Sequence, residues 1–122
     1  MRVLIAESDD DLGDVWERHL VRHGHQIRRV SSETEAIGMV QSFRPQVIIL
    51  DFALKGGNAL AVSDFTAFRL PEAQVIFVTR DSFFSDGEVF SLVANACVSV
   101  SEKVPPGDLL ALVDYYGARG GV

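Results

Sequence analysis

Short apolar runs recur along the chain, and each is followed by residues with helical spacing. Three of these runs are continuous, which is typical of parallel strands that are buried on both faces of a sheet. They are residues 3–6, 47–50 and 75–78. Residues 25–30 are apolar at few positions, and residues 98–101 alternate strictly between apolar and polar side chains. These two segments predict strands near or at the edges of the same sheet.

Helices are expected between and after these strands. Side chains that can cap a helix N-terminus stand at Ser8 or Asp9, at Ser31 or Ser32 with Glu35, at Asn58 and at Asp108. The expected helices cover about residues 9–23, 32–44, 58–69, 89–96 and 108–116. Gly24 is expected to end the first helix in a left-handed conformation, and Pro71 prevents continuation of the third.

Strand and helix alternate five times, which predicts right-handed crossovers and a parallel sheet with helices on both faces. The expected fold class is therefore α/β, a three-layer sandwich. A chain of 122 residues fits one domain, so residues 1–122 are expected to form a single unit with a frayed tail at 117–122.

Composition narrows the classes of function. No apolar run approaches the roughly 20 residues of a membrane span, and the N-terminal apolar stretch is too short for a signal peptide, so we expect a cytoplasmic protein without a membrane contact. The net charge of −6 argues against direct nucleic-acid binding, which needs clustered Lys and Arg. The lone Cys97 rules out an intramolecular disulfide and suggests a buried, unreactive thiol.

Polar side chains follow four of the predicted strands. They are Glu7 with Ser8, Asp51, Thr79 and Lys103. A parallel sheet gathers the carboxyl ends of its strands on one rim, where ligands bind in open α/β folds. Two carboxylates about 4 Å apart repel by about 4 kcal/mol at an effective dielectric constant of about 20, so such a cluster favours a cation. Magnesium prefers these hard oxygen ligands, and the set as a whole predicts phosphoryl transfer onto Asp51.

These motifs resemble, in order and over the whole chain, the receiver domains of response regulators in bacterial two-component signalling, including chemotaxis-regulator-like single domains. The segments that carry the resemblance are residues 3–9, residues 47–51, residues 75–79 and Lys103. The resemblance implies a flavodoxin-like fold with a five-stranded parallel sheet in the order 2-1-3-4-5.

The resemblance also implies a role for each site residue. Asp51 would accept a phosphoryl group from the phosphohistidine of a histidine kinase or phosphotransfer protein in a phosphorelay. Glu7, Asp51 and the Ala53 backbone carbonyl would hold Mg²⁺, and Thr79 and Lys103 would contact the phosphoryl oxygens. Such a protein is not a conventional enzyme, since its chemistry is limited to Mg²⁺-dependent self-phosphorylation and autodephosphorylation.

Five positions depart from the pattern of the family: Lys55 replaces a proline, Val104 separates Lys103 from Pro105, and three further departures affect the site more directly. Ser8 stands where the family has its second metal-binding acid, which predicts weak binding of Mg²⁺. Val100 stands where an aromatic ring normally moves on phosphorylation. Arg80 follows Thr79 where a small residue is common, and could either clamp the phosphoryl group or cover Asp51.

Two functions follow from this pattern. In the first, the chain is a phosphorylatable single-domain receiver that presents the face formed by residues 89–96, 98–101 and 108–116 to a downstream protein effector or to a second copy. In the second, it is a receiver-like module that pairs or dimerises without phosphorylation. Ser8, Val100 and Arg80 favour the second function, whereas Asp51 with Lys103 favours the first.

Overall fold

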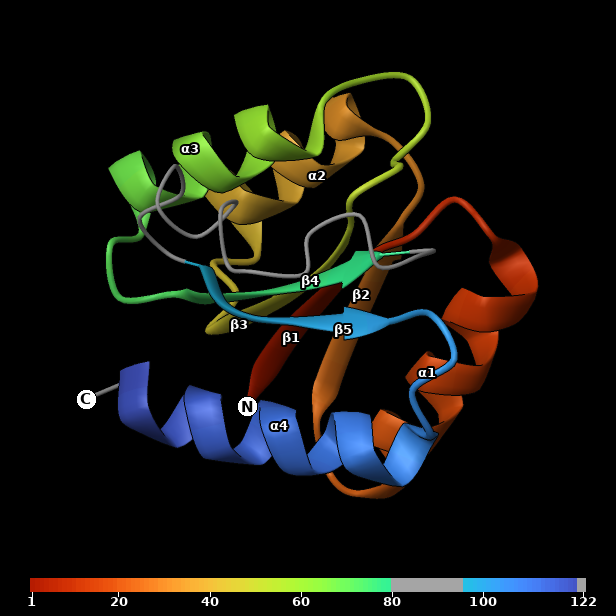
Figure 1. Cartoon of the computed structure of the whole chain (residues 1–122). Helices are drawn as coiled ribbons and strands as arrows, with labels where there is room; N and C mark the ends of the chain where they lie inside the picture. The colour runs from red at the N-terminus through yellow and green to blue at the C-terminus, as the bar shows by residue number, and fades with distance from the viewer. Residues whose placement is uncertain (80–95, 121–122) are drawn as a thin grey trace.

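The computed structural model describes residues 1–79 and 96–120, which form five strands and four helices around one sheet (Figure 1). The strands are β1 (Arg2–Ala6), β2 (Gln26–Val30), β3 (Val47–Asp51), β4 (Gln74–Thr79) and β5 (Ala96–Ser101). The helices are α1 (Asp10–Arg22), α2 (Glu33–Ser42), α3 (Ala59–Arg69) and α4 (Pro106–Gly120).

All neighbouring strands are parallel, and their order is β2-β1-β3-β4-β5. The helices α2 and α3 cover one face of the sheet, and α1 and α4 cover the other (Figure 1). The predicted α/β sandwich and strand order are therefore confirmed. The two strands with weaker or alternating patterns, β2 and β5, occupy the two edges, as expected from their partial exposure to solvent.

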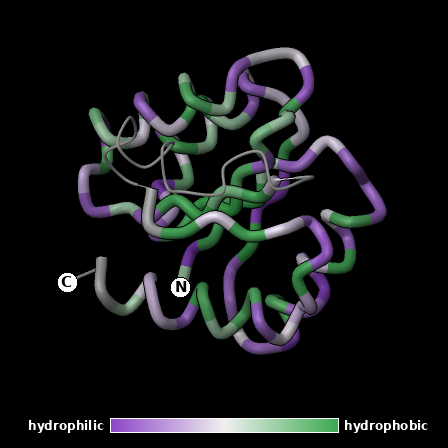
Figure 2. The backbone as a smooth tube through the Cα atoms, viewed as in Figure 1, coloured by the Kyte–Doolittle hydropathy of each residue, from purple (hydrophilic) through white to green (hydrophobic). Residues whose placement is uncertain are grey.

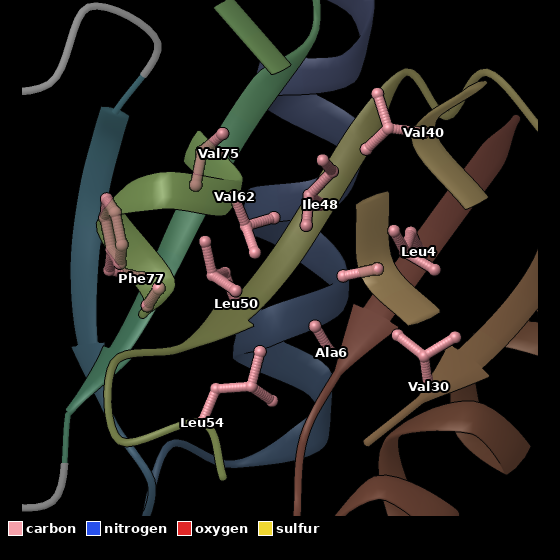
Figure 3. Close-up of a cluster of buried hydrophobic side chains, with 12 residues drawn as sticks. Leu4, Ala6, Val30, Val40, Ile48, Leu50, Leu54, Val62, Val75 and Phe77 are labelled. Atoms are coloured by element: carbon pink, nitrogen blue, oxygen red, sulfur yellow. The ribbon is translucent and has the colours of Figure 1, made fainter. Parts of the chain in front are cut away.

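Two apolar clusters fill the space between the sheet and its helices, one on each face. Alternation along a strand sends successive side chains to opposite clusters. Leu4, Ile48 and Leu50 thus pack towards α2 and α3 (Figure 3), while their strand neighbours pack against Trp16 of α1 and Val113 of α4. Figure 2 shows hydrophobic residues concentrated at the centre of the molecule and hydrophilic residues mainly at its periphery.

The helix caps predicted from sequence are confirmed for three helices. Asp9 caps α1 through its Oδ1, which accepts hydrogen bonds from two backbone amides of the first turn. The Ser32 hydroxyl accepts from the Glu35 amide at 3.3 Å, and Asn58 caps α3 in the same way. Gly24 lies just past α1 at φ 91°, a conformation that glycine adopts without strain.

Other boundaries differ from the prediction. The tail expected at 117–122 is wrong over its first residues, because α4 continues to Gly120. Gly117 is buried, and a Cβ there would collide with Met1 and lie 3.1 Å from Val47, so its lack of a side chain permits close packing rather than ending the helix. The same helix begins at Pro106, a favoured residue at the first helical position, instead of at Asp108.

The helix predicted at 89–96 lies outside the described residues except for Ala96, which belongs to β5. Arg80, which the sequence analysis singled out, also lies outside them. Within the part of the chain that is described, no helix is long and apolar enough to cross a bilayer.

Candidate functional site at the carboxyl edge of the sheet

Pairing between the strands brings the predicted site residues to one edge of the sheet. Ala6 pairs with Leu50, so Glu7, which follows β1, and Asp51, which ends β3, come next on two neighbouring strands, and such strands lie about 4.8 Å apart. Both side chains are almost fully buried, with exposed fractions of 2% for Glu7 and 1% for Asp51. The structure therefore places two buried acidic residues on adjacent strands, at the end of the sheet where α/β proteins bind their ligands.

Asp51 is held by the loop that follows it. Its Oδ1 accepts a hydrogen bond of 2.9 Å from the Ala53 amide, and its carbonyl accepts one of 3.2 Å from the Leu54 amide. Phe52 donates its amide to the carbonyl of Val78, which extends the pairing of β3 with β4 by one residue. These bonds fix the orientation of the carboxylate before any ligand arrives.

Glu7 is held in a similar way by the loop between β1 and α1. Its Oε2 accepts a hydrogen bond of 3.1 Å from the Asp9 amide, and its own amide donates to the Val30 carbonyl at 3.0 Å. The Asp9 side chain caps α1 and does not join the two buried carboxylates. Asp9, the nearest acid after Glu7 in the sequence, therefore caps α1, as the sequence predicted.

Ser8 lies between three loops. Its hydroxyl accepts a hydrogen bond of 2.8 Å from the Lys55 amide and donates a longer one of 3.4 Å to the Ser31 carbonyl. The Ser8 hydroxyl, at the position of the family's second metal-binding acid, is therefore already hydrogen-bonded to two backbone groups. It connects the loops after β1, β2 and β3.

Thr79 and Lys103 lie on the same edge, one and two strands away from Asp51. Thr79 pairs with Ser101, and its hydroxyl donates to the Val100 carbonyl at 3.4 Å. Lys103 lies in the turn after β5, is exposed, and has no carboxylate within 4.0 Å of its ammonium group among residues 1–79 and 96–120. The fold thus brings these residues to the predicted edge, while their contacts with a phosphoryl group stay predictions.

The acidic side chains at this edge suit a Mg²⁺ ion that takes only a few of its ligands from the protein. In the described part of the chain, no group of three or more His, Cys, Asp or Glu side chains is arranged to hold a metal. Mg²⁺ is commonly held by one or two carboxylates together with waters and phosphate oxygens, and Glu7 and Asp51 supply two. The Ala53 carbonyl is a third candidate ligand by the resemblance, while the Ser8 hydroxyl is already bonded to Lys55 and Ser31.

Contacts between the loops were not found from the sequence. Glu33 accepts a hydrogen bond of 2.6 Å from the Asn58 amide, which ties the start of α2 to the start of α3. A Cβ on Gly57 would collide with the Glu33 side chain. The adjacent glycines 56 and 57 are therefore the sequence feature that could have indicated a close contact between this loop and α2. At the same end of α2, hydrogen bonds from Ser31 and Ser32 lower the pKa of Glu35.

The fold and this edge define a doubly wound α/β domain with two buried carboxylates at the carboxyl ends of its central strands. The predicted resemblance is confirmed at the level of fold, since the chain has the receiver-domain fold of response regulators.

Two solved structures illustrate the similarity. A CheY-like response regulator receiver domain protein from Methanospirillum hungatei JF-1 is 21% identical with a TM-score of 0.88, covering 98% of this chain and 94% of its own. The receiver domain of Francisella response regulator 1452 is 14% identical with a TM-score of 0.84, covering 97% of each chain. At these identities the comparison establishes the fold.

Relatives by sequence are longer proteins. The transcriptional activator protein ExaE of Pseudomonas putida is 31% identical over 96 residues, which cover 75% of this chain and 42% of ExaE. The uncharacterized transcriptional regulatory protein YrkP of Bacillus subtilis is 33% identical over 55 residues, 45% of this chain and 23% of YrkP. The chain thus spans less than half the length of these relatives. No family model matches the sequence.

Proposed function

We propose that this chain is the receiver unit of a response regulator and that it accepts a phosphoryl group on Asp51. The observation that carries the proposal is the pair of buried carboxylates, Glu7 and Asp51, at the ends of adjacent central strands in a receiver fold. Thr79 and Lys103 on the same edge add a hydroxyl and an ammonium group that suit phosphoryl oxygens.

The proposed reaction is a transfer between two nucleophiles. An oxygen of the Asp51 carboxylate forms a bond to phosphorus, the bond from phosphorus to the donor imidazole nitrogen breaks, and the imidazole leaves with a proton. The Ala53 amide holds one carboxylate oxygen and so limits the rotation of the nucleophile. Bound Mg²⁺ would neutralise the charge of the two carboxylates and the phosphoryl group. Glu7 and Asp51 would hold that ion.

The phosphoryl donor is proposed to be a histidine kinase or a phosphotransfer protein, and the output a protein contact. ExaE, by its name, activates transcription, and this chain covers 42% of it. We therefore assign any nucleic-acid contact to other parts of such proteins and propose that these 122 residues, with a net charge of −6, make none themselves. We further propose that residues 1–122 form one domain and that this domain acts in the cytoplasm.

Intact mass tests the proposal. The chain is incubated with Mg²⁺ and the small phosphodonors acetyl phosphate and phosphoramidate, and one phosphoryl group should be added. Asp51→Asn should abolish the addition, while Asp9→Asn, which keeps a helix cap at the same edge, should leave it intact. Absence of a mass gain with both donors, or a gain that persists in Asp51→Asn, would reject phosphorylation at Asp51.

One observation favours the second function, a receiver-like module that pairs without phosphorylation. The Ser8 hydroxyl, in the place of a metal-binding acid, is bonded to Lys55 and Ser31. The loops are thus held together without a metal. In this case beryllofluoride, a mimic of the phosphoryl group, should change neither the amide spectrum nor the oligomeric state, whereas a phosphorylatable receiver should respond in at least one of them.

A further inference from the structure

A pocket of about 380 Å³ opens at the amino edge of the sheet, at the opposite end of the strands from Asp51. Three arginines from separate segments line it. They are Arg2 at the start of β1, Arg44 in the turn before β3 and Arg69 at the end of α3. The chain has 11 Lys and Arg residues and a net charge of −6, so this gathering of positive charge opposes the overall balance.

Hydrogen bonds join the segments that carry Arg2 and Arg44 to each other and to the start of β4. Arg2 donates its Nε to the Arg44 carbonyl at 2.9 Å, and its backbone amide donates to Gln46 Oε1 at 3.0 Å. The Gln46 amide returns a bond of 2.9 Å to the Arg2 carbonyl, and the Gln74 amide donates to the Gln46 carbonyl at 3.0 Å. The first guanidinium is therefore oriented before a ligand binds.

The three arginines of the pocket are not engaged in ion pairs with the acids of the described residues. Among residues 1–79 and 96–120, no carboxylate lies within 4.0 Å of the guanidinium groups of Arg2, Arg44 or Arg69. In contrast, Arg18 and Arg29 pair with acids on α1. Three arginines and one acid, Glu72, line the pocket, so positive charge is in excess there and favours the binding of an anion.

Arg44 stands in a backbone conformation that does not suit it. Its φ of 54° is left-handed, and it follows the C-cap Phe43 at the position where helices favour Gly or Asn. A glycine would fit this turn without strain, so the backbone alone does not explain an arginine there. Strained residues of this kind gather at binding sites.

We propose that the arginine pocket binds a small organic anion that carries a carboxylate or phosphate group. The guanidinium fork matches both oxyanions in a bidentate manner. Pro45, Leu70 and Pro71 contribute apolar walls for a short carbon chain, and the volume lies in the range of small-molecule sites. The site is separate from the proposed phosphorylation of Asp51, so either proposal can fail without the other.

The test titrates the ¹⁵N-labelled full chain with succinate and, separately, with glycerol phosphate at physiological salt. Saturable shifts are expected at the amides of Arg44, Gln46 and Ala73, and not at Ala53. The arm with the tighter binding distinguishes a carboxylate ligand from a phosphate ligand. No saturable shift with either probe, or shifts confined to the Asp51 end of the sheet, would overturn the proposal.

Variants separate recognition from general charge. Arg69→Gln should weaken binding about tenfold or more, because it removes charged hydrogen bonds to the anion. Arg18→Gln removes the same charge from a paired, exposed site on α1 and should leave binding unchanged. Glu72→Gln, which removes the acid that lines the pocket, should tighten binding. Equal effects of Arg69→Gln and Arg18→Gln would show unspecific attraction and reject the site.

Arg44→Gly gives the sharpest distinction. It relieves the left-handed backbone and keeps the carbonyl that accepts from Arg2. The variant should therefore unfold at a temperature no lower than the natural chain, yet bind the preferred probe about tenfold more weakly. Unchanged binding in this variant would contradict the assignment of Arg44 to the site.

Discussion

The Ser8 hydroxyl accepts a hydrogen bond of 2.8 Å from the backbone amide of Lys55, 47 residues further along the chain. The same hydroxyl donates to the Ser31 carbonyl at 3.4 Å. A side chain at the end of β1 therefore joins the loops after β2 and β3. The loop after β3 also holds the Asp51 carboxylate through the Ala53 amide, so the position that departs from the receiver pattern at the metal site has a structural role here.

Replacing Ser8 by alanine should loosen this connection. The Lys55 amide loses its acceptor, and we expect unfolding free energy to fall by about 1 kcal/mol. Urea unfolding measures the loss, and faster hydrogen exchange at Lys55 locates it. Ser42→Ala is the control, because Ser42 donates to Gly38 within the exposed part of α2 and should change stability little. A loss no larger than that of the control would show that the bond adds nothing.

Replacing Ser8 by aspartate should strengthen the binding of magnesium. A third carboxylate would join Glu7 and Asp51, and the affinity of oxygen sites for divalent cations rises with ligand charge, so we expect a gain of about tenfold or more. Isothermal titration with MgCl₂ measures it. Ser32→Asp adds the same charge while keeping a good helix cap, so an equal gain in that variant would point to net charge alone.

Much of this architecture could be predicted because its causes are local. Continuous apolar runs mark β1, β3 and β4, and Asp9, Ser32 and Asn58 satisfy amides of the helix turns that follow them. Strand order at the edges followed from the weak and alternating patterns of β2 and β5. The placement of Glu7 and Asp51 on one edge followed from the parallel sheet.

Contacts between loops could not be predicted in this way, since they depend on where separate loops lie in space. The bonds from Lys55 to Ser8 and from Asn58 to Glu33 join segments 47 and 25 residues apart. Gly117 illustrates the same limit, because glycine near a helix end reads as a stop, yet here its small size lets α4 approach Met1. Periodicity along one segment carries no information on such close approaches.

Gly57 should be intolerant of a side chain, although its neighbourhood is exposed. A Cβ there would collide with Glu33, whose carboxylate accepts from the Asn58 amide at 2.6 Å. We expect Gly57→Ala to lower the unfolding free energy by about 1–3 kcal/mol, through strain and the loss of that bond. Thermal unfolding measures the change.

Gly38→Ala is the matched control for this prediction. Gly38 lies within α2, and a Cβ there would meet nothing within 4 Å. Alanine favours a helix interior over glycine by about 0.5–1 kcal/mol, so this variant should be more stable than the natural chain. If both substitutions shifted stability in the same direction, the close approach of Gly57 and Glu33 would not be what limits residue 57.

Glu35 should make stability depend on pH in the acidic range. The Ser31 amide, and the Ser31 and Ser32 hydroxyls, all bond to Glu35 Oε1, with the Ser31 amide having the largest effect, and they hold the pKa of this carboxyl below its usual value. A folded-state pKa below the unfolded one means that the unfolded chain takes up the proton first as pH falls. The stabilisation is therefore complete above the unfolded pKa and is lost as pH falls through the folded one.

Glu35→Gln isolates this effect, since glutamine keeps an acceptor oxygen but cannot ionise. The difference in unfolding free energy between the natural chain and this variant should be largest near neutral pH and should shrink as the solution is acidified below the usual carboxyl pKa. Urea unfolding over a pH series measures the difference, and ¹³C NMR titration of the Glu35 carboxyl measures its pKa directly. A difference that stayed constant, or grew towards acid, would contradict the sign derived from the three hydrogen bonds.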